Sequence, residues 1–273
     1  MSEPLRILAF GAHPDDCDIS IGGLAVKYAR LGHKVKFVSV TNGNTGHFSQ
    51  GGGPLARRRY QEAQRSAAIA GIEYEVLDIH NGQLLPTLEN RWTIVRLIRE
   101  FRPDLILTNR PNDYHPDHRY TSQLVADAAY TVTIPNVQAL TPHLLVNPSV
   151  AYWADSFQRP YPFTPDVAVS IDDVIETKLD MMDCHESQMY EWLPYNDNEL
   201  DQVPADARER RAWMAKRRLP AMEKATDRYC DLLKKLYGEE AGGKVKYAEA
   251  LEFCEYGGPI TAEMFPRLFP FFG

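Results

Sequence analysis

Two short segments of the chain carry the residue types of a divalent-metal site. Residues 13–16 are HPDD and residues 115–118 are HPDH, so both contain a histidine, a proline, an acid and then another potential ligand. Imidazole and carboxylate groups suit a borderline divalent metal such as zinc. Three protein ligands with one open position are typical of a catalytic zinc site. Together the two segments predict one catalytic metal centre.

Each segment also has a simpler interpretation. An aspartate in front of a helix often caps it by accepting backbone N–H groups, which would explain the first segment. The histidines of the second segment could lie on the surface ahead of a helix. In the metal interpretation, one of the adjacent carboxylates of Asp15 and Asp16 binds the metal and the other faces the substrate. Four other histidines lack such acidic neighbours and are expected to be structural or surface residues: His33, His47, His80 and His143.

The two segments must be positioned by the elements that precede them. Short apolar runs predict buried strands, and apolar residues at helical spacing predict helices between them. Strands are expected at residues 5–11, 34–40, 74–79 and 104–108, and helices at 19–31, 57–70 and 88–101. This alternation predicts a Rossmann-like α/β fold, with a mainly parallel sheet flanked by helices. Such sheets hold their sites at the carboxyl ends of strands, and the two segments follow the first and fourth strands.

The second half of the chain is less regular. Strands are expected at residues 150–154, 167–171 and 244–255, and helices at 174–189 and 206–237. No repeat or linker marks a second domain, so we expect residues 1–273 to form one domain, with a core over about 5–190 and an extension over about 191–273. The tail, residues 264–272, contains four phenylalanines, which should pack on the domain or on a partner chain.

Composition and charge exclude several classes of partner. The formal net charge is −7, whereas binding to nucleic acid or an anionic membrane needs clustered lysine and arginine. The first apolar run, residues 5–12, is too short for a secretory signal, and no stretch approaches the ~20 apolar residues of a membrane span. The four cysteines form no C-x-x-C pair, so we expect free thiols in a reducing cytoplasm, with a disulfide as the alternative: Cys17, Cys184, Cys230 and Cys254.

The two segments, with their surroundings, resemble a known family. Residues 11–16 (GAHPDD) after the first strand, and HPDH about a hundred residues later, are similar to the LmbE-like, PIG-L type deacetylases. Members of that family remove acetyl from N-acetylglucosaminyl groups. Further similar segments are TNG at 41–43, R-x-x-E at 59–62, and Lys178 together with HESQ at 185–188. The resemblance covers roughly residues 5–190.

The resemblance implies a ligand set and a metal. His13, Asp16 and His118 match the zinc ligands of the family, so Zn²⁺ is the expected cofactor. Fe²⁺ or Co²⁺ would accept the same ligands. Many members have a glutamate directly after HPDD, where this chain has Cys17. Because that glutamate is not a zinc ligand, its absence does not argue against activity. It weakens what the resemblance implies about the residues around the ligands and about the substrate. Cys17 as a ligand or nucleophile is a minor alternative.

The resemblance also implies catalytic roles. Asp15 matches the general base, and His115 matches the histidine that stabilises the oxyanion or protonates the leaving amine. Asp117 matches the acid that orients and tunes this histidine, and we expect it to favour the imidazolium form. Arg59 could bind a hydroxyl or carboxylate of the substrate, or lie on the surface of its helix.

Three further features have two interpretations each. His185 and Gln188 could reach the site or pack in the core. The glycine-rich loop at residues 42–54 could be a mobile lid, because glycine allows the backbone change of closure, or a plain surface loop.

These observations predict a metal-dependent hydrolase that removes an acetyl group from an N-acetylated amino sugar or sugar conjugate. Its partner would be this small molecule, without nucleic acid or membrane, and the phenylalanine-rich tail and the family resemblance predict a homo-oligomer. One alternative is a metal-dependent amidase or carbamoyl hydrolase with a non-sugar substrate, and another is a catalytically idle binding protein. A nucleotide-binding enzyme is set aside, because no G-x-G-x-x-G follows the first strand.

Overall fold

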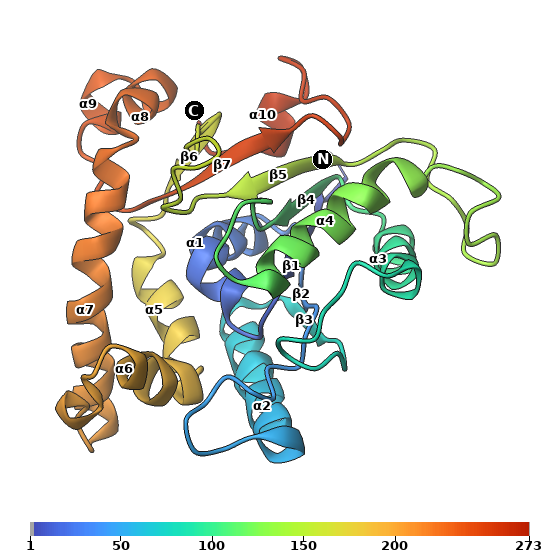
Figure 1. Ribbon diagram of the computed structural model, residues 1–273. Coiled ribbons are helices and arrows are strands. Elements are labelled where there is room, and N and C mark those ends of the chain that lie inside the picture. Colours follow the sequence, from blue (N-terminus) through green and yellow to red (C-terminus); the bar gives the residue numbers. More distant parts are fainter. Residues whose placement is uncertain (1–2, 273) are drawn as a thin grey trace.

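A seven-stranded sheet in the order β3-β2-β1-β4-β5-β7-β6 forms the centre of the molecule (Figure 1). The computed structural model describes residues 3–272, so residues 1, 2 and 273 of the predicted domain lie outside the described part. Neighbours from β3 to β5 are parallel, whereas β7 is antiparallel to both β5 and β6. The strands are β1 Arg6–Gly11, β2 Lys34–Ser39, β3 Glu73–Val76, β4 Leu105–Thr108, β5 Ser149–Trp153, β6 Val167–Ser170 and β7 Ala248–Cys254.

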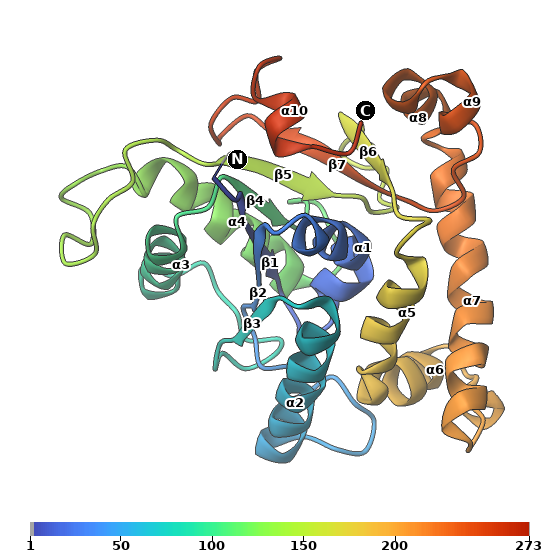
Figure 2. The same ribbon diagram turned by 180° about the vertical axis from the view of Figure 1, so that it is seen from behind.

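Helices cover both faces of this sheet, as Figures 1 and 2 show from opposite sides. The helices are α1 Asp16–Arg30, α2 Gly52–Ala70, α3 Leu88–Phe101, α4 Pro116–Thr131, α5 Ile175–Asp183, α6 Leu193–Asn196, α7 Ala207–Asp227, α8 Cys230–Tyr237, α9 Glu239–Gly242 and α10 Phe265–Leu268, with a π-helix at Ser187–Trp192 and a 3₁₀ turn at Leu200–Gln202. The core of α1 and α2 includes Ile7 and Ala9 of β1, whereas Leu8 and Phe10 join the core of α3 and α4. A strand covered on both faces must be apolar at successive positions, which explains the continuous run at β1.

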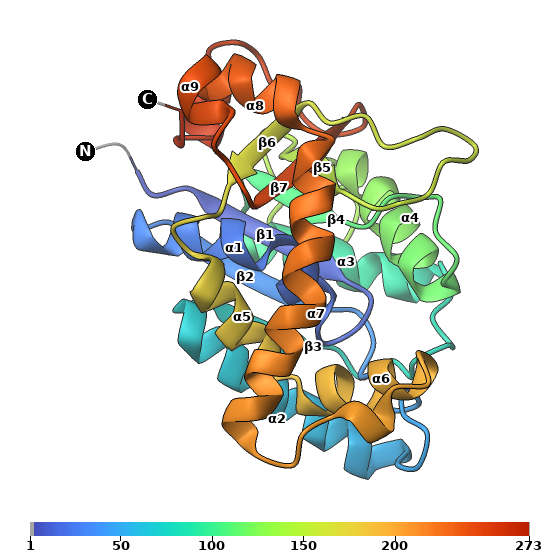
Figure 3. The same ribbon diagram turned by 90° about the vertical axis from the view of Figure 1, so that its left-hand side faces the viewer.

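The predicted fold class is confirmed, and the element boundaries differ mainly in the second half. Helix α3 has the predicted limits, and α2 starts five residues earlier than expected, at Gly52. The helix expected over 174–189 ends at Asp183 and continues as the separate π-helix. The helix expected over 206–237 is divided into α7 and α8. This break lets α8 turn onto β6, where Leu233 packs with Ala168, and α7 runs along the outside of α5 (Figure 3).

The C-terminal part contributes directly to the sheet and its core. Strand β7 lies between β5 and β6, so the sheet is completed by residues near the end of the chain. In the tail, Phe269 is buried, and the ring of Phe271 packs edge-on against that of Tyr28, with 4.9 Å between the ring centroids. The tail therefore packs on its own domain, and it no longer supports self-association. The division of the chain at about residue 190 stays a prediction.

Two other expectations concern the cysteines and membrane-spanning segments. All four cysteines are free thiols, as predicted. Within residues 3–272, no helix is long and apolar enough to cross a membrane.

Candidate functional site

The two predicted segments meet at the carboxyl ends of β1 and β4, which are neighbours in the sheet. From β1 the chain proceeds to β2 and β3 on one side, whereas β4 and β5 lie on the other. The loops diverge at such a switch point and leave a crevice. Gly11 ends β1, and a Cβ there would lie 2.9 Å from Cβ of Asp16. Glycine is therefore required for the tight turn that brings the first segment back over the strand end.

His13, Asp16 and His118 come together with the spacing of metal ligands. Nδ1 of His13 lies 3.2 Å from Nε2 of His118, and Oδ2 of Asp16 lies 3.6 Å from the first nitrogen and 3.4 Å from the second. Nitrogen and oxygen ligands at ~2.0–2.2 Å from one tetrahedral ion are ~3.3–3.5 Å apart. The three side chains are mostly buried. Their geometry fits a divalent metal between them.

Two carboxylates fix the orientation of the imidazoles from outside. Oδ2 of Asp117 lies 3.2 Å from Nε2 of His13, and Oδ2 of Asp113 lies 3.0 Å from Nδ1 of His118. An ionised carboxylate only accepts hydrogen bonds, so each outer ring nitrogen carries a proton. In the neutral form of each ring, the inner nitrogen then carries the lone pair that can bind a metal. Carboxylates behind metal-bound histidines commonly serve this purpose.

The protonation of these side chains also indicates a place for a cation. Burial alone would lower the pKa of His13, but the carboxylates of Asp16 and Asp117 raise it to about 9. Burial would likewise raise the pKa of Asp16, but His118 and His13 hold it well below its usual range. At neutral pH a proton thus occupies the cluster when no metal does. A metal would have to displace that proton.

Asp15 adopts a different position from its neighbour Asp16. It precedes α1 but forms no side-chain cap hydrogen bond, so the capping interpretation is wrong for this residue. Instead Oδ1 of Asp15 accepts a hydrogen bond of 2.7 Å from Arg59. Arg59 is 2% exposed and also donates to the carbonyl of Gly43, which excludes the surface alternative for Arg59. The substrate-binding role of Arg59 stays a prediction, because its guanidinium is engaged with Asp15.

His115 begins α4 and caps it with its side chain. Its Nδ1 accepts the N–H of Asp117 at 3.1 Å, so the proton of the neutral ring is on Nε2. Burial, together with the nearby His13 and His118, lowers the pKa of His115 to about 4. The expected imidazolium is therefore wrong at neutral pH. The carboxylate of Asp117 lies 4.0 Å from His115 Nδ1 and closer to His13, so it supports His13 more directly.

The three histidines also form a looser group. One ring nitrogen each from His13, His115 and His118 lies within 4.8 Å of the others. This set is wider than the one with Asp16, and Nδ1 of His115 is already engaged as a cap. The tighter set therefore has the better spacing for one ion.

These side chains line a cavity of about 550 Å³. The predicted site residues all line it except Asp117, which is buried behind His13. Thr45 and Gly46 of the glycine-rich loop at residues 42–54 also line the cavity. Residues that the sequence analysis did not single out complete the wall: Ile19, Ser20, Asn81, Tyr114, Trp192, Leu193 and Asn196. Nothing in the sequence pattern marks Trp192 or Tyr114, because they come from a π-helix and an irregular loop. Asp113 could have been found as another acid beside the second segment.

The family-like segment at 185–188 supports the site from behind. His185 is fully buried, 3.2 Å from Asp18, and does not line the cavity, which favours its structural interpretation. Gln188 does line the cavity and donates to the carbonyl of Gly46. Lys178 forms a buried ion pair of 2.6 Å with Glu249 of β7, a partner that no local sequence pattern predicts.

Cys17 is a core residue. Its side chain is fully buried, and burial with Asp18 and Asp16 nearby raises the pKa of its thiol well above the usual range. A thiol in that state is neither a nucleophile nor a metal ligand.

Comparison with known proteins finds relatives of this chain. Residues 8–129 match the PIG-L family, described as GlcNAc-PI de-N-acetylase. A diacetylchitobiose deacetylase of Thermococcus kodakarensis is 34% identical over 207 residues, which span 70% of this chain and 74% of that protein. The chain belongs to the PIG-L family. The first and second segments fall inside the matched residues, so the predicted resemblance is confirmed.

Solved structures share the fold of this PIG-L family member. An N,N′-diacetylchitobiose deacetylase from Pyrococcus horikoshii superposes with a TM-score of 0.69 at 24% identity, covering 92% of this chain and 84% of that one. A 4-carboxy-2-hydroxymuconate hydratase from Pseudomonas putida gives a TM-score of 0.68 at 17% identity, covering 91% and 96%. A deacetylase and a hydratase thus share this architecture. The fold alone does not select the reaction.

Proposed function

We propose that this protein is a metal-dependent deacetylase, which hydrolyses the acetamide of an N-acetylated amino sugar or sugar conjugate. The observation that carries the proposal is the convergence of two imidazole nitrogens and one carboxylate oxygen at 3.2 to 3.6 Å, beside the carboxylate of Asp15 in the same cavity. The 34% identity to a diacetylchitobiose deacetylase supports the substrate class.

His13, Asp16 and His118 would hold the metal, and Zn²⁺ suits their nitrogen and oxygen donors. Fe²⁺ and Co²⁺ suit them as well. When bound, such a metal polarises the amide carbonyl and makes a water molecule acidic enough to attack near neutral pH. Asp113 and Asp117 would keep the two imidazoles in the required tautomers.

Asp15 would move the proton of the reaction. One of its oxygens is held by Arg59, which leaves the other free to accept a proton from the attacking water. Water oxygen bonds to the amide carbon as Asp15 takes this proton. The carbon–nitrogen bond then breaks, and Asp15 returns the proton to the departing nitrogen, so that a free amine and acetic acid are formed; the acid then ionises to acetate. Arg59 is a positioning residue in this scheme.

His115 would stabilise the negative charge that develops on the carbonyl oxygen. Its neutral ring carries the proton on Nε2, which can donate a hydrogen bond into the cavity. A group with a pKa of about 4 is not protonated at neutral pH and has no second proton to give. His115 is therefore assigned the oxyanion role, and the proton for the leaving amine is assigned to Asp15.

The test is an assay of the zinc-loaded protein against N,N′-diacetylchitobiose, N-acetylglucosamine, simple acetamides and carbamoyl compounds, measuring acetate and free amine. We expect equal amounts of both products from an acetylated sugar, and none after removal of the metal. Turnover of the non-sugar compounds alone would support the amidase or carbamoyl hydrolase alternative. Tight sugar binding without any turnover would support an idle binding protein.

A further inference from the structure

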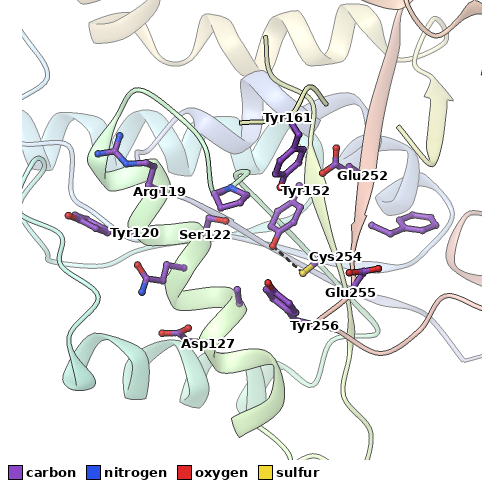
Figure 4. Close-up of a pocket in the computed structure, with 14 residues that line it drawn as sticks. Arg119, Tyr120, Ser122, Asp127, Tyr152, Tyr161, Glu252, Cys254, Glu255 and Tyr256 are labelled. Carbon is purple, nitrogen blue, oxygen red and sulfur yellow. Dashed lines mark hydrogen bonds between the residues drawn. The ribbon is translucent and has the colours of Figure 1, made fainter. Parts of the chain in front are cut away.

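A second cavity, of about 620 Å³, lies between α4 and the strands β5 and β7 (Figure 4). The loops that precede α4 and follow β5 and β7 complete its walls. The segment from Pro111 to Arg119, which includes the first turn of α4, separates it from the catalytic cavity: Pro111 and Arg119 line the second cavity, whereas Tyr114 and His118 line the first. A volume of this size is within the ~300–1,000 Å³ of small-molecule sites. None of the predicted catalytic residues lines it.

Tyrosines supply much of the wall of this cavity. Tyr120, Tyr152, Tyr161 and Tyr256 line it, and they come from α4, β5, the loop after β5 and the end of β7 (Figure 4). Tyr152 is buried, with its hydroxyl 3.1 Å from the thiol of Cys254. Aromatic faces attract cations and also pack on the apolar faces of sugar rings.

The charge of the cavity is negative. Three acids line it, and the one cation, Arg119, donates to the carbonyls of Asp113 and Tyr114 in the separating loop. Glu255 is exposed and has no ion-pair partner within residues 3–272. The two other acids are Asp127, which lies 3.8 Å from Arg91, and Glu252, which accepts the N–H of Thr164 and lies 3.8 Å from the buried Arg110. The acids therefore stand on both walls, and their cationic partners within residues 3–272 are no closer than 3.8 Å.

Ser122 is a second and independent sign of a ligand. Its hydroxyl extends from α4 into this cavity, on the side where Tyr152 lies (Figure 4). The residue is 1% exposed, and its oxygen has no hydrogen-bond partner within residues 3–272. A buried hydroxyl without a partner is destabilising, because it has lost its hydrogen bonds to water. A polar molecule in the cavity would satisfy it.

We propose that this second cavity binds a small molecule with a protonated primary amine and hydroxyl groups, as an amino sugar has. The amine would be attracted by the negative charge of the three acids, the ring would lie against the tyrosines, and a hydroxyl would lie against Ser122. The choice of an amino sugar rests on the proposed function, since deacetylation of an N-acetylated sugar produces this chemistry. The negative charge and the orphaned hydroxyl do not depend on it.

Calorimetric titration of the zinc-loaded full-length protein with glucosamine at pH 6.5 tests the proposal. We expect a saturable site that the double variant Asp127→Asn/Glu255→Gln weakens about tenfold, because two exposed charge interactions are lost. Ser122→Ala should weaken binding by about threefold to tenfold, while the variant unfolds at the same or a higher temperature than the wild type. Glu263→Gln, an exposed acid outside both cavities, is the matched control and should bind like the wild type.

Two further titrations locate the site and define the ligand. Trp192→Ala alters only the catalytic cavity, so glucosamine binding should be unchanged; a loss confined to this variant would place the amine there and overturn the proposal. Methyl glucoside, which lacks the amine, should bind at least tenfold more weakly than glucosamine. Equal binding of the two, or no saturable binding of glucosamine, would also overturn it. Glucosamine binding that persists in a protein without acetate release would contradict the proposed function alone.

Discussion

The HPDD and HPDH segments contain similar residues in the same order, yet matching positions have different environments. His13, the histidine of HPDD, directs its Nδ1 into the ligand cluster. His115, the first histidine of HPDH, uses its Nδ1 to cap α4. Asp15 lies in the cavity against Arg59, whereas Asp117 is buried behind His13. Only the fourth positions, Asp16 and His118, both point to the centre. The geometry of each turn, more than residue type, decides which side chain is a ligand and which is a support.

The histidines of the two segments give the largest expected contrast. His13→Ala should lose its metal and lower turnover by ~10³ or more, because the metal supplies several kcal/mol of transition-state stabilisation. His115→Ala should keep its metal and lose ~10²–10³ in kcat, as for an oxyanion donor. Metal analysis and acetate-release assays of both variants would check this. If His115→Ala lost the metal instead, the three-histidine group would be the ligand set.

Asp15 and Asp117, the acids at the third positions of the two segments, should respond differently to substitution. Asp15→Asn should retain metal and reduce kcat by ~10² or more, because it removes the proton acceptor. Asp117→Asn should instead weaken metal affinity by ~10–100-fold and regain most activity with excess metal. Kinetics over a range of metal concentrations separate the two variants. Rescue of Asp15→Asn by metal would assign Asp15 to the ligands and contradict the comparison.

Asp113 supports the other histidine of the ligand set, His118. It holds His118 as Asp117 holds His13, so Asp113→Asn should also weaken metal affinity, by ~10-fold. Glu263→Gln is an exposed control outside the cavity. Competition with a chelator of known affinity would measure both variants. An unchanged affinity in Asp113→Asn would restrict the supporting role to the carboxylate behind the first segment.

Metal affinity is also expected to depend on pH. His13 has a pKa of about 9 without metal, so it is protonated at pH 7 and the metal must displace that proton. Apparent affinity should therefore rise by about tenfold per pH unit from pH 7 and level off as pH passes the pKa of His13. Chelator competition at several pH values would show the slope. A flat response between pH 7 and 9 would mean that His13 binds no proton in the free protein.

Much of this arrangement could be predicted from the sequence. Alternating apolar runs and helical periods located β1, β4 and α3, and the strand-end rule then placed the two segments together. The partners of individual side chains could not be predicted, because they depend on rotamers and on distant elements. Asp117 follows His115 by two residues but supports His13, and Lys178 pairs with Glu249 from the far end of the chain.

The second half of the chain was harder to predict for a related reason. Its helices are not separated by glycine or proline at the points where they break, so the continuous patterns at 174–189 and 206–237 concealed two turns. Those turns are set by packing: α8 covers β6, and the π-helix brings Trp192 to the cavity. Tertiary contacts there override local preference.

Anomalous diffraction from crystals of the zinc-loaded protein tests the proposed ligand set. We expect one strong zinc peak about 2.0–2.2 Å from Nδ1 of His13, Oδ2 of Asp16 and Nε2 of His118, with an open position toward the cavity and Asp15 outside the ligand set. A peak that includes His115 in place of Asp16, or no peak between these residues, would contradict it.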